Sequence, residues 1–468
     1  MLVHSTLHRG LVELAPAAPG KLGLYVCGAT VQSEPHVGHG RYAVVFDMIR
    51  RYLVWRGNEV TYVRNITDID DKIIVAAAEA GETVEGRATR IAKLFSSAYR
   101  ALGVDDPDVE PKATEHIPEM IDLISRLLDR GLAYVGDNGD VYFSVRAWEA
   151  YGKLSGRRPD DLRAGARVEI SEAKQDPLDF ALWKTAKPGE PSWDSPWGAG
   201  RPGWHIECSA MAARYLGSDF AIHGGGNDLI FPHHENEIAQ SEGANGRTFA
   251  RYWLHNGMLN LSGEKMSKST GLLVDLNGAI DRFGGMALRL FYLRAHYRSP
   301  LDYSEELVEA AAAAYDRLHR FLVRAPRSAA TDPAPEVMER FVAVMDHDFS
   351  TPEVIAVLFD SINEANRLLD DGEMPAGLVA AIHEISRVLG FGPEARGLDD
   401  LAADLGMLAS EFDLPLGEPA DMIDSMLDRR RQARRDRDFA TSDRIRDRLA
   451  AIGIQVEDTA DGSRWLRR

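Results

Sequence analysis

Two short segments of the chain carry cationic side chains in patterns suited to binding phosphate. The first signature segment, HVGH, runs from His36 to His39 around Gly38 at the start of a helical pattern. A helix N-terminus and two imidazoles can face a phosphate group, and glycine permits a close approach to the backbone. The second signature segment, KMSKS, carries Lys265 and Lys268, whose ammonium groups can neutralise a charged transition state. A lone HVGH is more typical of a helix cap, so the first segment gains its weight from the second.

A second set of residues has the chemistry of a metal site. The chain has two cysteines, Cys27 and Cys208, which cannot build a disulfide framework in a protein of this length. His233 and Glu237 lie four residues apart in a helical pattern, so their side chains share one helix face. Two sulfurs, one imidazole and one carboxylate form a donor set that suits tetrahedral zinc.

The residue types alone leave the histidine ligand open. His205 lies three residues before Cys208, so these two are also helix neighbours, and His234 follows His233 directly. Each cysteine or histidine taken singly is more typical of a buried core position. The joint pattern is what favours metal ligation.

The elements that position these residues begin with a β-α-β pattern. Residues 22–27 form a short apolar run, residues 42–53 carry apolar side chains at helical spacing, and residues 59–64 are typical of a second strand. This order predicts parallel strands joined by a helix. Cys27 then falls at the carboxyl end of the first strand, where open α/β sheets bind ligands.

A second set of elements follows much later in the chain. The patterns predict a strand over 220–223, a glycine turn over 224–226, a helix over 236–242 and a strand over 252–261. Residues 157–204, between the two sets, are rich in Pro, Gly and Trp and look too irregular for the core of a sheet. The sequence therefore predicts an α/β fold with a split, Rossmann-like parallel sheet and an insertion.

Beyond residue 300 the pattern becomes helical and then strongly charged. The apolar stripe of residues 305–323 recurs in 352–369 and 378–389, which predicts a helical bundle. Residues 422–452 predict a charged helical segment in a small C-terminal domain. The domains expected are a split catalytic domain over 1–115 and 200–262, a connective insertion over 116–199, the second signature segment and its surroundings over 263–300, the bundle over 301–395, a linker over 396–418 and the C-terminal domain over 419–468.

Composition and charge restrict the class of protein. The chain of 468 residues is 45% hydrophobic and 27% charged, as in folded globular proteins, and no apolar run reaches the length of a membrane span. No leader-like segment opens the sequence, so we expect a cytoplasmic protein without membrane contact. The net charge of −18 argues against broad nucleic-acid binding. Residues 429–468 nevertheless hold twelve arginines against seven carboxylates, which charge alone assigns to a solvated helix face.

The two signature segments, in this order and with an insertion between them, resemble those of class I aminoacyl-tRNA synthetases. Other segments resemble the cysteinyl-tRNA synthetase family, and the likeness runs nearly end to end. These segments are LYVCG at 24–28, NITDIDDK at 65–72, EPSW at 190–193, GWHIECS at 203–209, FPHHENE at 231–237 and the tail from Asp458 to Trp465. The chain departs from the family at Ala29, where the family commonly has Pro, and at 32–35, where it commonly has aromatic residues. The resemblance therefore does not define the conformation of this loop.

The resemblance implies an enzyme, a cysteine–tRNA ligase, that activates L-cysteine with ATP to cysteinyl-adenylate and transfers it to the terminal adenosine of tRNA(Cys). It implies a stem-contact region after the second signature segment and a C-terminal anticodon-binding domain. We expect one Zn²⁺ per chain, Mg²⁺ with ATP, and a monomer. The catalytic residues implied are His36, His39, Lys265 and Lys268. The ATP-binding residues implied are Gly38, His39, Gly225 and Lys268. The substrate-binding residues implied are Thr67, Trp204, His223 and Asp228. The metal ligands implied are Cys27, Cys208, His233 and Glu237, which ranks His205 and His234 second.

Two rival functions remain at this stage. A cysteine:amino-sugar ligase of the mycothiol pathway resembles the same family through its catalytic half but lacks an equivalent tail. A catalytically silent RNA-binding relative is the other, and the intact signature segments and metal set argue against it.

Overall fold

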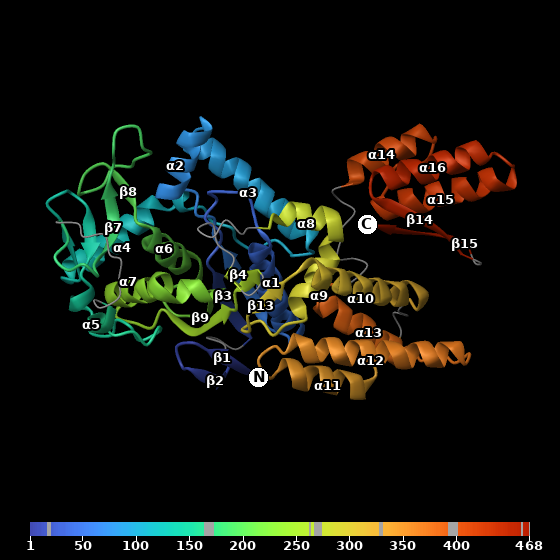
Figure 1. Cartoon of the computed structure of the whole chain (residues 1–468), viewed down its shortest axis with the longest axis horizontal. Coiled ribbons are helices and arrows are strands. Elements are labelled where there is room, and N and C mark those ends of the chain that lie inside the picture. Colours follow the sequence, from blue (N-terminus) through green and yellow to red (C-terminus); the bar gives the residue numbers. More distant parts are fainter. Residues whose placement is uncertain are drawn as a thin grey trace. The chain divides into compact units, whose positions relative to one another are not determined.

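The molecule consists of two compact units, residues 1–391 and residues 392–468. The computed structural model describes residues 1–15, 20–162, 173–261, 264–265, 274–326, 331–391, 401–459 and 462–467. Figure 1 shows both units, and each is described here by itself.

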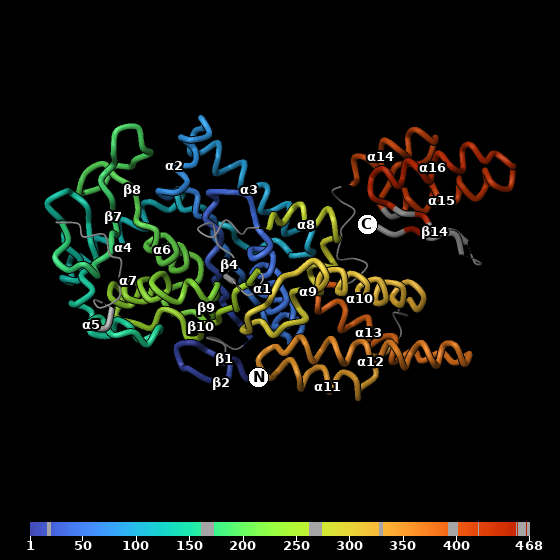
Figure 2. The backbone as a smooth tube through the Cα atoms, viewed as in Figure 1, coloured from blue at the N-terminus to red at the C-terminus, as the bar shows by residue number. Residues whose placement is uncertain are grey.

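A four-stranded parallel sheet forms the centre of the first unit. Its strands run in the order β10–β9–β3–β4, so two strands from early in the chain pair with two from much later (Figure 2). The strands are β3 (Lys21–Val26), β4 (Glu59–Arg64), β9 (Phe220–Gly226) and β10 (Ala250–Asn256). The prediction of a split parallel sheet is confirmed.

Helices cover both faces of this sheet, because successive residues of a strand point to opposite sides. Leu24 packs in the core that contains helix α1 (Val37–Trp55), whereas Tyr25 packs in the core that contains helix α6 (Trp204–Leu216). Figure 1 shows α1 and α6 on either side of the sheet. A strand buried on both faces reads as a continuous apolar run, which is why β3 was visible in the sequence.

Residues 224–226 continue strand β9 instead of forming the expected turn. A Cβ on Gly224 would lie 2.3 Å from the ring of Phe46, so glycine is needed where this side chain of α1 lies against the strand. The expected strand over 252–261 is also different: it is divided into β10 and a separate strand β11 (Leu259–Leu261).

The insertion has a sheet of its own, which corrects the expectation of an irregular segment. Four antiparallel strands lie in the order β5–β6–β7–β8. They are β5 (Ala133–Val135), β6 (Val141–Phe143), β7 (Phe180–Thr185) and β8 (Gly200–Pro202), accompanied by α4 (Ile117–Asp129), η2 (Val145–Ala147) and α5 (Pro159–Leu162). Trp183 is buried in this part of the core, so aromatic residues that look irregular in sequence fill a small sheet.

The remaining elements of the first unit are mainly helices. Those before the insertion are β1 (Leu2–Ser5), β2 (Gly10–Glu13), α2 (Asp71–Ala80), α3 (Val84–Ala101) and η1 (Ala113–Glu115). Those near the second half of the sheet are η3 (Asn227–Leu229), η4 (Ile230–His234), α7 (Glu235–Asn245), β12 (Glu264–Lys265), α8 (Leu276–Phe283), α9 (Gly285–Leu293) and β13 (Leu301–Tyr303). The bundle comprises α10 (Glu305–Arg324), α11 (Pro335–Met345), α12 (Thr351–Asp370) and α13 (Ala376–Val388). Among the described residues no helix is both long and apolar enough to cross a membrane.

The second unit is a small helical domain with a hairpin. Its elements are α14 (Ala402–Glu411), α15 (Pro419–Arg435), α16 (Phe439–Ala451), β14 (Ile454–Thr459) and β15 (Gly462–Arg467). Helix α14 occupies part of the segment 396–418 that was expected to be a linker. The helix forms there because Leu405 and Leu408 are buried in the core of this unit. Trp465 packs against the same core, and its indole N–H donates to Asp424 at 3.0 Å. Its contacts are those of a packing residue.

Candidate functional site: a buried metal centre beside the first signature segment

Four side chains from separate parts of the chain converge beyond the carboxyl end of the sheet. Cys27 follows β3, Cys208 lies in α6, and His233 and Glu237 lie at the junction of η4 and α7. One donor atom from each lies within 4.8 Å of the others, and all four residues are buried. We call these four residues the donor cluster. Glu237 Oε1 is 3.2 Å from Cys27 Sγ and 3.1 Å from His233 Nε2.

His205 orients His233 rather than joining the cluster. The Nδ1 atoms of the two rings are 2.9 Å apart, so one ring donates to the other. Burial, together with the neighbouring His233, holds the pKa of His205 well below its usual range, so the His205 ring is neutral. With Nε2 of His233 directed at the cluster as a ligand, Nδ1 of His233 carries the proton and donates to Nδ1 of His205. The arrangement leaves Nε2 of His233 facing the cluster, as a ligand held by an outer hydrogen bond would be. Sequence spacing suggested His205 only as a rival ligand, and it did not indicate this supporting role.

The protonation of the donor cluster favours a cation. Burial opposes ionisation of Glu237, but His223 and His233 outweigh it and hold the pKa of this carboxyl well below its usual range. Burial likewise opposes ionisation of Cys208, but hydrogen bonds from Cys27 and His233 lower its pKa to about 6. Burial opposes protonation of His233, but Glu237 and Cys208 outweigh it and raise its pKa to about 10, so its imidazolium balances one of these two negative charges. A metal ion bound by the cluster would take the place of that proton. With its two sulfurs, imidazole and carboxylate, the set fits zinc.

A second possible set shares two of these residues. One donor atom from each of Cys27, Glu237, His223 and His234 also lies within 4.8 Å of the others. Because both sets use the same cysteine and carboxylate, they describe alternatives for one ion. The donor cluster has two sulfurs and the other set has one, and thiolates favour zinc. With the donor cluster as ligands, His223 Nε2 remains 2.9 Å from the second oxygen of Glu237 and supports it.

The structure brings three of the four expected substrate residues to this centre. The ring of Trp204 is 4.2 Å from the ring of His233, and His223 contacts Glu237. Thr67 Oγ1 accepts from the side-chain amide of Asn65, whose oxygen lies 3.7 Å from Cys208 Sγ. Asp228 lies farther out in η3 and is exposed. Thr67, Trp204 and His223 therefore lie beside the donor cluster.

The first signature segment caps helix α1. His36 accepts from the backbone N–H of Gly38, and His39 accepts from the backbone N–H of His36. The two rings lie 3.7 Å apart. A Cβ on Gly38 would touch the His36 ring at 3.0 Å, so glycine lets this ring fold over the first turn. The cap that the sequence suggested as the plainer explanation is present, and it holds both imidazoles at the helix N-terminus.

The second signature segment is described only in part. The backbone of Lys265 lies in β12 and pairs with Asn260 of β11, while Lys268 lies outside the described residues. Gly225, expected to contact ATP, lies in β9, and a Cβ there would meet the ring of His234 at 2.7 Å.

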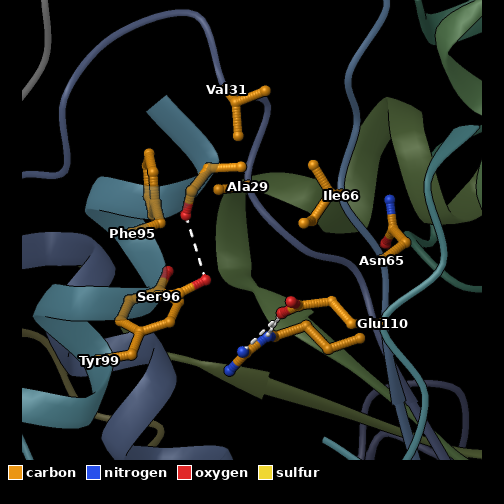
Figure 3. A pocket seen from close by; sticks show the side chains of 10 residues that line it. Ala29, Val31, Asn65, Ile66, Phe95, Ser96, Tyr99 and Glu110 are labelled. Atoms are coloured by element: carbon orange, nitrogen blue, oxygen red, sulfur yellow. Dashed lines mark hydrogen bonds and ion pairs between the residues drawn. The ribbon is translucent and has the colours of Figure 1, made fainter. Parts of the chain in front are cut away.

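A small cavity lies beside the site and is shown in Figure 3. Its volume is about 20 Å³, enough for about one water molecule. Ala29 and Phe95 line one side, and the ion pair of Arg64 with Glu110 closes another. Phe95 also packs edge-on against His39 at 4.9 Å. The cavity is too small for an amino acid or a nucleotide, so it does not compete with the donor cluster as the substrate site.

Asn65 is a site residue that the sequence analysis did not single out. Its side-chain oxygen accepts from the backbone N–H of Gly28 at 2.9 Å and lies 3.7 Å from Cys208 Sγ. It thereby fixes the turn after Cys27 and contacts a second member of the donor cluster. Its position directly after β4, at the same sheet edge as Cys27, was the signal that could have found it.

Comparisons with known proteins find family models and relatives that together cover nearly the whole chain. Residues 13–313 match the model of the tRNA synthetases class I (C) catalytic domain, residues 340–392 the DALR domain, and residues 418–465 the cysteinyl-tRNA ligase anticodon binding domain. A cysteine–tRNA ligase of Thioalkalivibrio sulfidiphilus is 50% identical over 99% of both chains. The one of Halorhodospira halophila is 49% identical over 99% of both.

Solved structures show the same fold at low identity. Mycobacterium tuberculosis methionyl-tRNA synthetase in complex with methionyl-adenylate superposes with a TM-score of 0.56 at 17% identity, over 82% of this chain and 94% of that one. The Agrobacterium radiobacter LeuRS in its ternary complex gives 0.60 at 11% identity, over 84% and 86%. These likenesses establish a class I synthetase fold. With the three family models and the full-length relatives, they show that the chain belongs to the cysteinyl-tRNA synthetase family.

Proposed function

We propose that this protein activates L-cysteine with ATP and transfers it to the terminal adenosine of tRNA(Cys). The observation that carries the proposal is the donor cluster, whose Cys27 follows the carboxyl end of β3, at the edge where open α/β sheets bind ligands. The identity of about 50% over full length to cysteine–tRNA ligases supports it.

Zinc held by the donor cluster would account for selection of cysteine over serine. The two amino acids differ by sulfur for oxygen, and a pocket that relies on apolar contact or size separates such near-isosteres by only about 1 to 3 kcal/mol. A zinc ion, when bound here, would accept the substrate thiolate as a further ligand, which serine cannot match. Thr67, Trp204 and His223, which lie beside the donor cluster, would contact the rest of the small substrate.

The proposed first step is attack of the cysteine carboxylate on the α-phosphorus of ATP, with departure of pyrophosphate. His36 and His39 sit at the N-terminus of α1, where the helix dipole favours negative charge. Lys265 and Lys268 supply positive charge to the transition state, and ATP enters as its Mg²⁺ complex. No side-chain nucleophile is required, because the chemistry depends on alignment of the two substrates.

The second step would use the C-terminal unit to hold tRNA. Several arginines of α15 and α16 already pair with carboxylates of their own unit, including Arg444 and Arg448 with Glu411 and Arg431 with Asp428. RNA phosphates would compete for these side chains, so binding should weaken with salt. The match of residues 418–465 to an anticodon-binding domain favours tRNA over the amino sugar of the mycothiol-pathway ligase.

Charging of tRNA with radiolabelled cysteine tests the proposal. We expect cysteine-dependent pyrophosphate exchange, transfer to tRNA(Cys), and one zinc per chain by elemental analysis. Transfer to an amino sugar with no charging of tRNA would overturn it in favour of the rival ligase. We propose a cytoplasmic reaction, because its substrates are ATP and tRNA, and light scattering should give the mass of a monomer.

A further inference from the structure

Arg41 is a buried cation in the first turns of helix α1, two residues after His39. Its side chain is inaccessible to solvent, and none of the ion pairs between described side chains includes it. Burial lowers the pKa of Arg41 to about 10, so the guanidinium remains charged near neutral pH. A buried charge without a carboxylate is costly unless its hydrogen bonds are satisfied.

Backbone carbonyls accept from the two terminal nitrogens of the guanidinium, whereas Nε has no hydrogen-bond partner among the described residues. Arg41 donates to the carbonyl of Met258 at 2.8 Å, of His296 at 3.3 Å and of Ser299 at 2.5 Å. Met258 directly precedes β11, and the same carbonyl accepts from the backbone N–H of Leu301 at the start of β13. The planar guanidinium therefore holds two chain segments at the point where β11 and β13 begin to pair.

Strand β11 connects this point to the second signature segment. Asn260 of β11 pairs with Lys265 of β12, and Leu261 pairs with Glu264. The backbone that carries Lys265 is thus placed by β11, whose start is fixed by Arg41. Because Arg41 and His39 lie on one rigid helix, a shift of Arg41's partners would move Lys265 relative to the first signature segment.

Other hydrogen bonds fix the return of the chain to the same helix. The N–H of Val37 donates to the carbonyl of Val274, and the N–H of Leu276 donates to the carbonyl of Pro35, each at 3.0 Å. These bonds use backbone groups on both sides of His36. Between the described residues of β11 and α1 no backbone hydrogen bond is formed, and the side chain of Arg41 supplies the link on that side.

We propose that Arg41 is a positioning residue for adenylate formation, which holds strand β11, and with it Lys265, in register with the imidazoles of His36 and His39. The inference rests on the proposed adenylation. Arg41 acts through the backbone of residues 258–265 and touches neither substrate. Lysine cannot replace it, because one ammonium group cannot reproduce a planar fork shared by three carbonyls.

The test compares Arg41→Lys and Arg41→Met with the wild type in rapid-quench measurements of cysteinyl-adenylate, expressed per zinc-loaded active site. Misplacement by about 1 Å can cost about a hundredfold in rate. We expect the rate to fall by about tenfold in Arg41→Lys and about a hundredfold in Arg41→Met, with dissociation constants for ATP and cysteine within about threefold of wild type. Hydrogen exchange of peptides covering 258–265 should speed up in both variants.

Arg289→Lys is the matched control. Arg289 is equally buried and also binds backbone carbonyls, those of Leu389, Leu102 and Gly103, but it pairs with Asp47 farther along α1. The Arg289→Lys substitution should lower the melting temperature while leaving the rate of adenylate formation per active site and the hydrogen exchange of residues 258–265 unchanged. A wild-type rate in Arg41→Lys and Arg41→Met, or an equal loss in Arg289→Lys, would overturn the proposal. If the wild type made no adenylate, the proposed function would fail, and hydrogen exchange would still decide whether Arg41 holds β11.

Discussion

Replacement of His205 by alanine should weaken zinc binding without removing a ligand. The change would leave Nδ1–H of His233 buried without the acceptor that now lies 2.9 Å away. An unsatisfied buried donor costs about 1–3 kcal/mol, which corresponds to a loss of about 5- to 150-fold in affinity. This range agrees with the roughly 10- to 100-fold effect of outer hydrogen-bond partners at metal sites. Competition with a fluorescent chelator at equilibrium measures it directly.

Two further variants separate the hydrogen bond from packing. Phe180 contacts the His205 ring edge-on at 5.5 Å, so Phe180→Leu loosens the same region while keeping the bond, and its zinc affinity should stay within about threefold of wild type. His205→Gln offers an amide oxygen as acceptor and should recover part of the loss. The reasoning is refuted if His205→Ala binds zinc as tightly as the wild type, or if Phe180→Leu loses as much.

Three other outcomes follow from the same site. Cys208→Ser should lose stoichiometric zinc and cysteine-dependent pyrophosphate exchange while ATP affinity stays within about threefold, as elemental analysis and equilibrium dialysis would measure; normal cysteine activation would exclude the zinc pocket. Lys268→Ala should slow adenylate formation by about two to three powers of ten with little change in substrate binding, as followed by rapid quench; a defect confined to ATP binding would contradict its role. Truncation after Phe391 should leave pyrophosphate exchange nearly unchanged but sharply reduce tRNA charging, because the second unit has its own core; charging equal to that of the full chain would exclude the tail as a tRNA-binding element.

The central sheet was predictable because its signals are local. Strand β4 begins and ends where the apolar pattern of Glu59 to Arg64 places it, and β3 differs from its predicted range by one residue at each end. Tertiary contacts overrode local signals elsewhere. Gly224 looks like a turn residue but lies in a strand because Phe46 leaves no room for a side chain. Helix α14 contains Gly and acids typical of a linker, yet its apolar face packs in the second unit.

The candidate site shows the same division. The four members of the donor cluster were expected together, and the structure places their donor atoms within 4.8 Å. The residues around them depend on side-chain directions that spacing does not encode. His205 is as close to Cys208 in sequence as any helix neighbour, but its ring turns towards His233. Arg41 looks like an ordinary surface arginine in the sequence, and only the fold reveals the three carbonyls around it.

The order of strands in the central sheet has a consequence for synthesis on the ribosome. Strand β3 ends at Val26, but its partner β9 begins only at Phe220. At translation rates of about 5–20 residues per second, this edge of the nascent sheet waits on the order of 10–40 s for its neighbour. Cys27 waits equally long for the other three members of the donor cluster. The unpaired edge is a site where another chain could add a strand, so the sheet is open to pairing with a wrong partner for much of the synthesis of the first unit.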